Sequence, residues 1–438
     1  MTVVSRGTPS QHVIVVGGGV IGTAIAWRAA RAGQRVTLID PGGDDPQTDD
    51  KASLVAAGML GPVSESVFGE QDLLNLNLHA VDRFPSFNAE LEEATGMTTG
   101  LRTEGTLAVA YDSGDLAALD RLTDFRHGIG LQAERLSARE CRKLEPFLAP
   151  NAMGGVFAKG DLSVDNRRYL AALRAAAAAA GVERVTGIVT AVDAGTVAVA
   201  PPGKPGTGPA PRNPVGSPAD DQVRMLTAHY VVIAAGHAIR QLDGVPDAVR
   251  TAIRPVKGQI LRLRHPGSIP PVLTHTVRAI VQGHDLYLVP RADGELVVGA
   301  TQEERDDRDV MAGAVHDLLR DAQIAVPAVS ELIFAEANAG LRPGTSDNGP
   351  ILGAIPSTGP STGGAADSDG SLIIAAGHFR NGIMLSAITA DAVAAILGGQ
   401  APHPAWTPFQ PGRFGAPDRP PAAGVSSGGT VSPGETTL

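Results

Sequence analysis

The chain contains 438 residues, with 53 glycines, 33 prolines, one cysteine and a formal net charge of −10 at pH 7. This length is too great for one small core and predicts two or three domain-sized units. A hydrophobic share of 43% indicates a folded globular protein. The negative charge argues against nucleic acid or anionic lipid as a partner. The lone Cys141 excludes an intramolecular disulfide and fits a reducing cytoplasm.

The N-terminal region holds the first ordered elements. Residues 1–10 are polar and are expected to form a frayed terminus. The apolar run 13–27 is too short to span a membrane and is interrupted by glycines. No other stretch reaches membrane length without a charge, so we expect no membrane segment.

A glycine-rich motif lies inside a predicted β-α-β unit made of a strand at 13–16, a helix at 20–32 and a strand at 35–39. Such a unit has a right-handed crossover and a parallel sheet. The motif's glycines, Gly17, Gly19 and Gly22, permit a tight turn and close approach of backbone N–H groups to a pyrophosphate at the helix N-terminus.

The acidic residue Asp40 ends the second strand, where its side chain can accept hydrogen bonds from ribose hydroxyls. Together with the glycine motif it predicts a dinucleotide site. The alternative is a structural β-α-β unit without a ligand, and the glycine motif alone does not distinguish FAD from NAD.

The remaining chain alternates between helical and strand-like patterns. Helices are expected at 71–95, 115–128, 137–144, 166–180, 309–324 and 383–397. Strands are expected at 103–111, 188–199, 223–235, 258–264, 286–290, 295–299, 331–337 and 371–376. The 258–299 region favours antiparallel pairing, with a turn at Asp293-Gly294 between two apolar strands.

Much of the glycine surplus lies in three spacer-like segments. Residues 201–222 are predicted to be an extended hairpin insertion, and residues 356–370 a second loop of the same type. Residues 401–438 are predicted to be a disordered tail.

An internal echo pairs VVIAAGH at 231–237 with LIIAAGH at 372–378. Both strands would end at the carboxyl edge of a parallel sheet, where ligands bind in such folds. Small residues there leave room for a cofactor, although coincidence in an alanine-rich chain is the alternative.

Several segments resemble the FAD-dependent amine oxidases of the D-amino-acid oxidase type, and within that family the glycine oxidases of thiamine biosynthesis. They are AAGML at 56–60, HDLYLVP at 284–290, VGAT at 298–301, GLRPGT at 340–345 and GHFRNGI at 377–383. The resemblance covers about residues 11 to 397.

This resemblance implies an α/β fold in which a Rossmann-like FAD-binding domain carries an inserted mixed or antiparallel-sheet substrate domain. The FAD-binding domain would comprise 11–83, 160–248 and 338–400, and the substrate domain 84–159 and 249–337. FAD would be bound noncovalently, because Cys141 lies in a predicted helical surface stretch remote from the flavin motifs.

The motif and the resemblance together give the residues expected at the FAD. They are Gly17, Gly19, Val20, Ile21, Gly22, Asp40, Pro41, Ser53, Ala56, Ala57, Gly58, Met59, Val189, Ala235, Gly236, His378, Phe379, Arg380, Asn381, Gly382, Ile383 and Met384. Val189 is assigned through the strand 185–192, which would contact the adenine through its backbone. The helix that follows Gly382 would direct its N-terminus at the flavin.

The resemblance also implies the substrate-binding residues. Arg342, in a loop fixed by Pro343 and Gly344, would bind the substrate carboxylate through its planar guanidinium, helped by the Tyr287 hydroxyl. Arg380 would lie at the substrate amine. The alternatives are an ordinary surface arginine at 342 and a structural, cofactor-side residue at 380.

Other candidates are assigned structural roles. His378 is interpreted as a capping or packed histidine without acid–base work, and Lys257 as structural. The eleven histidines show no metal-binding spacing, so no metal site is expected.

The implied activity is oxidative deamination of glycine, and potentially of sarcosine or small D-amino acids, with O₂ as acceptor and H₂O₂ as product. Iminoacetate would supply thiazole synthesis, and the enzyme would be a cytoplasmic homo-oligomer, such as a tetramer. Gln302 stands where the family pattern has an apolar pocket residue, which puts the exact substrate in question. The alternatives are a D-amino-acid dehydrogenase that reduces a quinone and a non-catalytic dinucleotide-binding protein.

Overall fold

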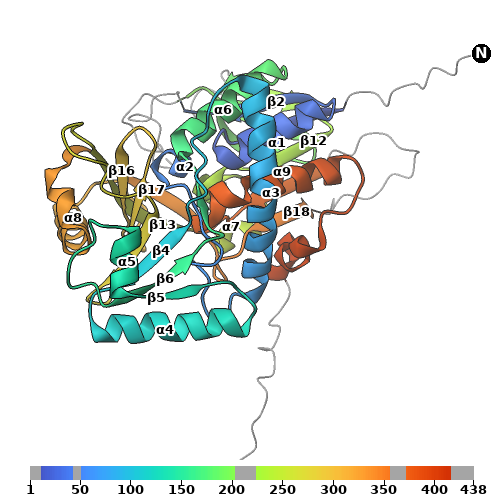
Figure 1. Ribbon diagram of the computed structural model, residues 1–438. Helices are drawn as coiled ribbons and strands as arrows, with labels where there is room; N and C mark the ends of the chain where they lie inside the picture. The colour runs from blue at the N-terminus through green and yellow to red at the C-terminus, as the bar shows by residue number, and fades with distance from the viewer. Residues whose placement is uncertain (1–10, 43–50, 203–222, 356–370, 416–438) are drawn as a thin grey trace, which may run out of the picture.

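Two sheets of unlike topology form the body of the protein, and Figure 1 shows them side by side. The structure is a computed structural model and describes residues 11–42, 51–202, 223–355 and 371–415. The predicted terminus 1–10, nearly all of the predicted insertion 201–222, the second loop 356–370 and residues 416–438 of the predicted tail lie outside the described residues.

The first sheet has six strands in the order β18-β19-β12-β1-β2-β8, and all neighbours are parallel except β18 and β19. Its strands are β1 (His12–Val16), β2 (Arg35–Asp40), β8 (Glu183–Thr186), β12 (Tyr230–Ile233), β18 (Ile351–Ile355) and β19 (Ser371–Ala376). The predicted β-α-β unit is confirmed, and so is the shared carboxyl edge of the two echoed strands.

Alternate residues of β1 pack on opposite layers, as expected for a strand buried on both faces. Val13 and Val15 contact the helical layer, and Ile14 and Val16 contact the opposite layer. The helical layer contains α1 (Val20–Arg31), α3 (Gln71–Thr95), α6 (Asn166–Ala179) and α9 (Gly382–Leu397). The opposite layer contains an antiparallel sheet of β9 (Ile188–Asp193), β10 (Thr196–Ala200) and β11 (Arg224–Thr227), with η2 (Gly236–Gln241) and α7 (Asp247–Ala252).

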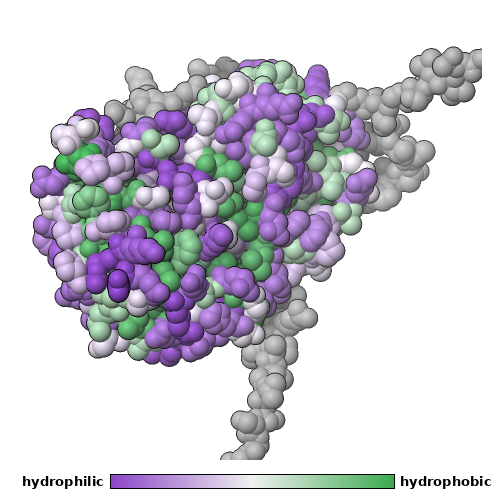
Figure 2. Space-filling model, viewed as in Figure 1, coloured by the Kyte–Doolittle hydropathy of each residue, from purple (hydrophilic) through white to green (hydrophobic). Residues whose placement is uncertain are grey.

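The segment Phe379–Leu397 is long and apolar enough to cross a membrane, but two thirds (67%) of it is buried. Its helix α9 packs against α1 and α3 in the core, and the segment contains Arg380 and Asp391. A core helix of this kind passes the same test, so the segment is weak evidence for a membrane span. Most of the face in Figure 2 is hydrophilic, with smaller hydrophobic areas between the polar residues.

The second sheet has eight strands in the order β17-β13-β16-β15-β14-β4-β6-β5, and only β14 and β4 are parallel neighbours. Its strands are β4 (Thr106–Ala110), β5 (Glu134–Ser137), β6 (Gly154–Ala158), β13 (Arg254–Arg264), β14 (Thr276–Val281), β15 (His284–Pro290), β16 (Glu295–Gly299) and β17 (Ile333–Gly344). The predicted antiparallel pairing and the Asp293-Gly294 turn are confirmed.

Helices cover the second sheet away from the first. Its outer face packs against α5 (Ala138–Leu144), α8 (Ala312–Ala325) and the short η3 (Pro327–Glu331), while α4 (Ser113–Gly128) packs on β4 and β6. Its inner face contacts the segment with α2 (Ala52–Val55) and β3 (Met59–Leu60), which pairs with β7 (Leu162–Ser163). The inner face therefore meets the region predicted to hold the flavin.

Three predicted strands are each divided into two shorter strands in the structure. The run 188–199 turns at Gly195 into the β9–β10 hairpin, and 223–235 divides between two different sheets. The strand assigned to Val189 breaks at Gly187, so Val189 lies in β9 and not in the parallel sheet. The flanks of the predicted insertion do pair, as β10 with β11.

Two further predictions were wrong. Cys141 is fully buried under the second sheet, not at the surface, because α5 turns this residue toward Gly155 of β6. Burial raises the pKa of its thiol to about 11. Residues 401–415 are not disordered, because they form η5 (Pro404–Phe409) and η6 (Pro411–Phe414) and bury Trp406 and Phe409 in the first core.

Three of the four predicted boundaries between the two domains fall inside elements. The boundary at 83/84 cuts α3, whose apolar face packs in the first core, and that at 337/338 cuts β17 of the second sheet. The division into two domains remains a prediction.

Candidate active site

The glycine-rich turn joins β1 to α1 at the carboxyl edge of the first sheet. Gly17 has φ +107°, and a side chain there would overlap the carbonyl of Ala234. A side chain at Gly22 would overlap the carbonyl oxygen of Gly17. The glycines of the motif therefore let the helix, the turn and the neighbouring strand pack closer together than residues with a side chain would permit.

The carboxylate of Asp40 is buried beside this turn and already has protein partners. It accepts hydrogen bonds from the N–H groups of Gly18 (2.6 Å) and Gly42 (2.9 Å) and pairs with Lys51 (2.8 Å). These partners do not exclude a ribose, because a carboxylate can accept several hydrogen bonds. The contact between Asp40 and the ribose remains a prediction. Pro41, next in the chain, is exposed.

The segment 51–61, predicted to be a loop beside the cofactor, contains the one-turn helix α2 and the short strand β3. Its Ser53 hydroxyl accepts a hydrogen bond from the N–H of Val20 at the start of α1 (3.0 Å). Ala57 is buried, and Ala56 and Met59 are half-buried. Gly58 has φ +74°, and a side chain there would overlap the Val164 carbonyl.

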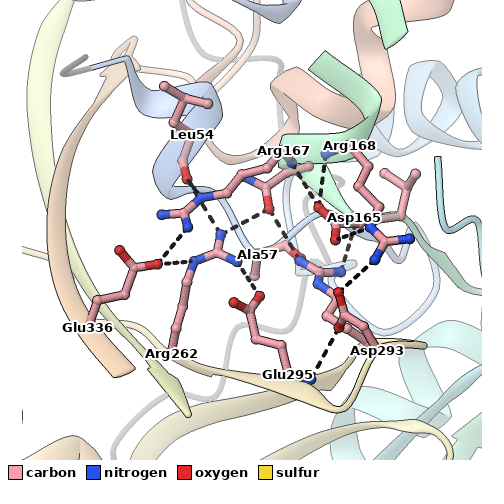
Figure 3. A network of polar contacts seen from close by, with 12 residues as sticks. Leu54, Ala57, Asp165, Arg167, Arg168, Arg262, Asp293, Glu295 and Glu336 are labelled. Carbon is pink, nitrogen blue, oxygen red and sulfur yellow. Dashed lines mark hydrogen bonds and ion pairs between the residues drawn. The ribbon is translucent and has the colours of Figure 1, made fainter. Parts of the chain in front are cut away.

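The carbonyl groups of this segment are held by a polar network that reaches across to the second sheet (Figure 3). The Arg262 guanidinium of β13 donates to the Leu54 carbonyl (3.4 Å) and pairs with Glu295 and Glu336. Arg291 donates to the Ala57 carbonyl (2.5 Å). Burial lowers the pKa of Arg262 and lowers that of Arg291 to about 10. These contacts fix the segment at the junction of the two sheets.

Two more loops converge on the same edge from β12 and β19. Gly236 (φ +57°) and Gly377 (φ +72°) turn the chain after the two echoed strands. Among the described residues, apart from the chain neighbours of Gly236, no atom lies within 4 Å of where its side chain would begin. Phe379 adopts φ +46°, a left-handed conformation that costs a non-glycine residue about 1–2 kcal/mol. Strain of this kind is concentrated at functional sites.

Asn381 supplies a sign that this edge holds a ligand. Its side chain is 3% exposed, and neither its amide nitrogen nor its amide oxygen has a hydrogen-bond partner among the described residues. Buried polar groups are otherwise nearly always paired. Together with the open space at Gly236, this unpaired amide fits an edge that binds FAD.

His378 is buried and its Nε2 lies 3.0 Å from the Thr389 hydroxyl. Burial lowers the pKa of its imidazole to about 3, so the ring is neutral at physiological pH. This geometry fits the interpretation of a packed histidine. After η4 (Phe379–Asn381), α9 begins at Gly382, and Ile383 and Met384 are buried in the first core.

Arg342 lies in β17 and not in a loop, because the ladder between β13 and β17 continues to Gly344. Its guanidinium lies over Gly258 of β13, where any side chain would overlap it. Its Nη1 donates to the carbonyls of Thr301 (3.2 Å) and Lys257 (3.5 Å). No carboxylate of the described residues pairs with this half-buried cation.

Tyr287 reaches toward the same place from β15, which flanks β13 and β16 on the side opposite to β17. It lies directly opposite Gly299 of β16, and a side chain at Gly299 would begin 2.5 Å from the Tyr287 hydroxyl. Burial raises the pKa of that hydroxyl, and the positive charge of Arg342 opposes the rise. Gly258 and Gly299 thus leave a surface without side chains on β13 and β16, across which Arg342 and Tyr287 approach each other.

Sequence reasoning did not assign this role to Gly258 and Gly299, nor any role to Glu65 or Arg278, which lie beside Tyr287. Glycine inside a strand is itself a signal that another group approaches the backbone closely. This signal would have indicated the surface without side chains at Gly258 and Gly299. Glu65 and Arg278 carry no local signal, because the fold alone brings them together.

The structure places the remaining candidates as follows. Arg380 pairs with Glu70 (3.1 Å) at the start of α3. Lys257 is fully buried and pairs with Asp307 (2.5 Å). Gln302 is exposed. In the described parts of the chain no cluster of metal-ligating side chains is found.

A parallel sheet with a glycine-cradled carboxyl edge is the architecture of a dinucleotide-binding protein. Residues 12–396 match the family model described as FAD dependent oxidoreductase (DAO). The chain belongs to this family of FAD-dependent oxidoreductases, which confirms the predicted fold class and enzyme class.

Individual relatives show which members of the family the chain resembles. A glycine oxidase of Geobacillus kaustophilus is 32% identical over 396 residues, covering 89% of this chain and 93% of the relative. The bifunctional protein ThiO/ThiG of Synechocystis is 31% identical over 416 residues, and the match covers 94% of this chain but 55% of that relative, so the chain spans about half its length. The crystal structure of glycine oxidase from Geobacillus kaustophilus superposes with a TM-score of 0.75 at 30% identity, covering 92% of this chain and 99% of that one.

Proposed function

We propose that this protein is an amine oxidase that converts glycine and O₂ to iminoacetate and H₂O₂. The observation that carries the proposal is the Arg342 guanidinium, half-buried and without a carboxylate partner among the described residues. A planar cation in this state is suited to a substrate carboxylate. The relatives named glycine oxidase support glycine as the amine.

The chain's own residues supply position and environment in this proposal. The edge formed by Gly17, Gly22, Gly236 and Asn381 would hold FAD noncovalently, and FAD, when bound, supplies the hydride acceptor that O₂ reoxidises. Arg342 and Tyr287 would bind the carboxylate of the substrate and so direct its α-carbon. The neutral His378 is committed to Thr389 and takes no part in proton transfer.

The test is anaerobic titration of the purified holoenzyme with glycine, sarcosine and small D-amino acids while the flavin absorbance is recorded. Glycine is expected to bleach the flavin, and readmitted O₂ to restore the colour with one H₂O₂ per substrate. Colourless protein would refute every flavin hypothesis. Yellow protein that glycine leaves unbleached would refute glycine as substrate, and bleached flavin that O₂ does not restore but a quinone does would identify a dehydrogenase.

The biological setting is part of the same proposal. The relatives named ThiO support a role in thiamine biosynthesis, where iminoacetate would supply the thiazole. We further propose a cytoplasmic homo-oligomer, such as a tetramer, which the molar mass in solution would test.

A further inference from the structure

Glu65 is a carboxylate placed beside the Arg342–Tyr287 pair. Its side chain is 13% exposed and contacts Arg278 of β14 (3.4 Å). Arg278 lies directly opposite Tyr287 in the β14–β15 ladder, so the two side chains share the inner face of the sheet. The charge of Glu65 acts on the Tyr287 hydroxyl in the sense opposite to that of Arg342. The Tyr287 hydroxyl thus lies within reach of both a cation, Arg342, and an anion, Glu65.

The loop that carries Glu65 is held by two buried ionisable residues. Asp161 is fully buried and accepts hydrogen bonds from the N–H groups of Val63 and Ser64, both 3.1 Å long. Arg126 is 3% exposed and donates to the Ser64 carbonyl (2.8 Å). Burying two charged groups is costly, and here both are used to fix the backbone next to Glu65. The position of this carboxylate is therefore preorganised.

The carboxylate retains unused hydrogen-bonding capacity. Its contact with Arg278 is 3.4 Å, whereas charge-assisted hydrogen bonds are about 2.7–2.9 Å. Glu65 also lines a small pocket with Arg380, Asn77 and Asn381. The amide oxygens of Asn77 (7% exposed) and Asn381 (3% exposed) have no hydrogen-bond partner among the described residues. The pocket thus offers acceptors to a ligand that donates.

We propose that Glu65 binds the amino group of the substrate whose carboxylate Arg342 holds. This inference rests on the proposed function, because it takes the substrate to be a small amino acid. Such a molecule carries a hydrogen-bond donor and an anion on either side of one carbon, and Glu65 and Arg342, which both act on the Tyr287 hydroxyl, offer the matching charges. Binding at both points fixes the α-carbon, which binding at the carboxylate alone would leave free to rotate.

The test compares two ligands of the holoenzyme, glycine and acetate, which share the carboxylate and differ in the amino group. The glycine dissociation constant comes from the concentration dependence of anaerobic flavin reduction, and that of acetate from its perturbation of the oxidised flavin spectrum. Glu65→Gln is expected to weaken glycine at least about tenfold and acetate less than twofold. Glu65→Asp should recover part of the loss. Glu104→Gln, which alters another arginine-paired carboxylate (to Arg102, 3.1 Å), should change neither constant.

The outcomes separate this inference from the proposed function. Equal weakening of glycine and acetate in Glu65→Gln would mean that Glu65 only supports Arg278 and the loop, and unchanged constants would mean that it does not contact the substrate. Either result overturns the inference. If Arg342→Ala leaves acetate binding intact, the proposed function itself fails. An unchanged melting temperature and flavin content in Glu65→Gln would exclude misfolding as the cause of a loss.

Discussion

The two sheets of this protein place glycine in different ways, and the difference separates a backbone site from a side-chain site. At the edge of the first sheet, Gly17, Gly236 and Gly377 follow the ends of strands and adopt positive φ, so the main chain itself forms the cradle. In the second sheet, Gly258 and Gly299 lie within the ladder and leave space that Arg342 and Tyr287 occupy. At Gly17 a side chain would overlap the backbone, whereas at Gly258 and Gly299 it would meet only the ends of the Arg342 and Tyr287 side chains.

The largest effect is expected from Gly22→Ala, which tests the backbone site. The new methyl group would overlap the carbonyl oxygen of Gly17, and neither group can move without opening the turn. We expect loss of FAD from the purified protein and a destabilisation of about 1–3 kcal/mol. Visible absorbance and thermal unfolding measure these. Gly313→Ala in α8, where a side chain would meet no described residue outside its own helix within 4 Å, is the control and should retain colour and stability. A yellow, stable Gly22→Ala protein would contradict the backbone site.

Next in size is Arg342→Ala, which tests the side-chain site. Losing the cation should reduce kcat/KM for glycine by about 10²–10³-fold, since truncating one partner of a charge pair costs about 2–5 kcal/mol. FAD should remain bound, because the residue lies on the second sheet. Steady-state kinetics and flavin content measure both. Arg342→Lys should restore little, because a lysine lacks the planar fork. Loss of FAD in Arg342→Ala would mean that the two sites are not separate.

A smaller effect is expected from Gly258→Ala, which sharpens the contrast between the two sets of glycines. The new methyl group would displace only the end of the Arg342 side chain. We therefore expect KM for glycine to rise about tenfold, one tenfold step being about 1.4 kcal/mol, with FAD content and the melting temperature nearly unchanged. A collapse of stability, as expected for Gly22→Ala, would show that this glycine serves the backbone after all.

The last effect, which is on stability alone, concerns its pH dependence at the backbone site. The pKa of His378 falls from 6.5 to about 3 on folding because the ring is buried. Between these values the unfolded chain binds the proton and the folded chain does not, so stability is complete above pH 6.5 and falls as the pH drops toward 3. At pH 5 the loss is about 2 kcal/mol. Denaturant unfolding of the wild type and His378→Gln at pH 7.5 and 5 measures it. An equal loss in both proteins would contradict the assignment.

The β-α-β unit and its glycine turn can be predicted from the sequence because their signal is local. Gly17, Gly19, Gly22 and Asp40 lie within one β-α-β unit, and the glycine motif can be interpreted without knowing any distant pairing. The side-chain site was available only through the family resemblance. Arg342 and Gly258 come from strands far apart in the chain, and their contact depends on the register of β13 with β17.

The wrong predictions also arise from contacts between residues far apart in the chain. Cys141 lies in a polar stretch that favours a surface helix, but tertiary packing turns it under the second sheet. Residues 401–415 have a loop-like composition, yet two aromatic side chains, Trp406 and Phe409, find space in a core completed by distant elements. Local composition does not carry such long-range contacts.

The C-terminal position of β19 and α9 has a consequence for biosynthesis. The first helix, α1, packs against α9, and the parallel sheet around β1 gains β19 only after residue 376 has been made. A growing chain therefore leaves the apolar surface of its first β-α-β unit uncovered until almost all of it has left the ribosome. Folding dominated by such long-range pairing is slow and leaves intermediates prone to aggregation. A chain terminated before α9 would be a substrate for chaperones and proteases rather than a smaller enzyme.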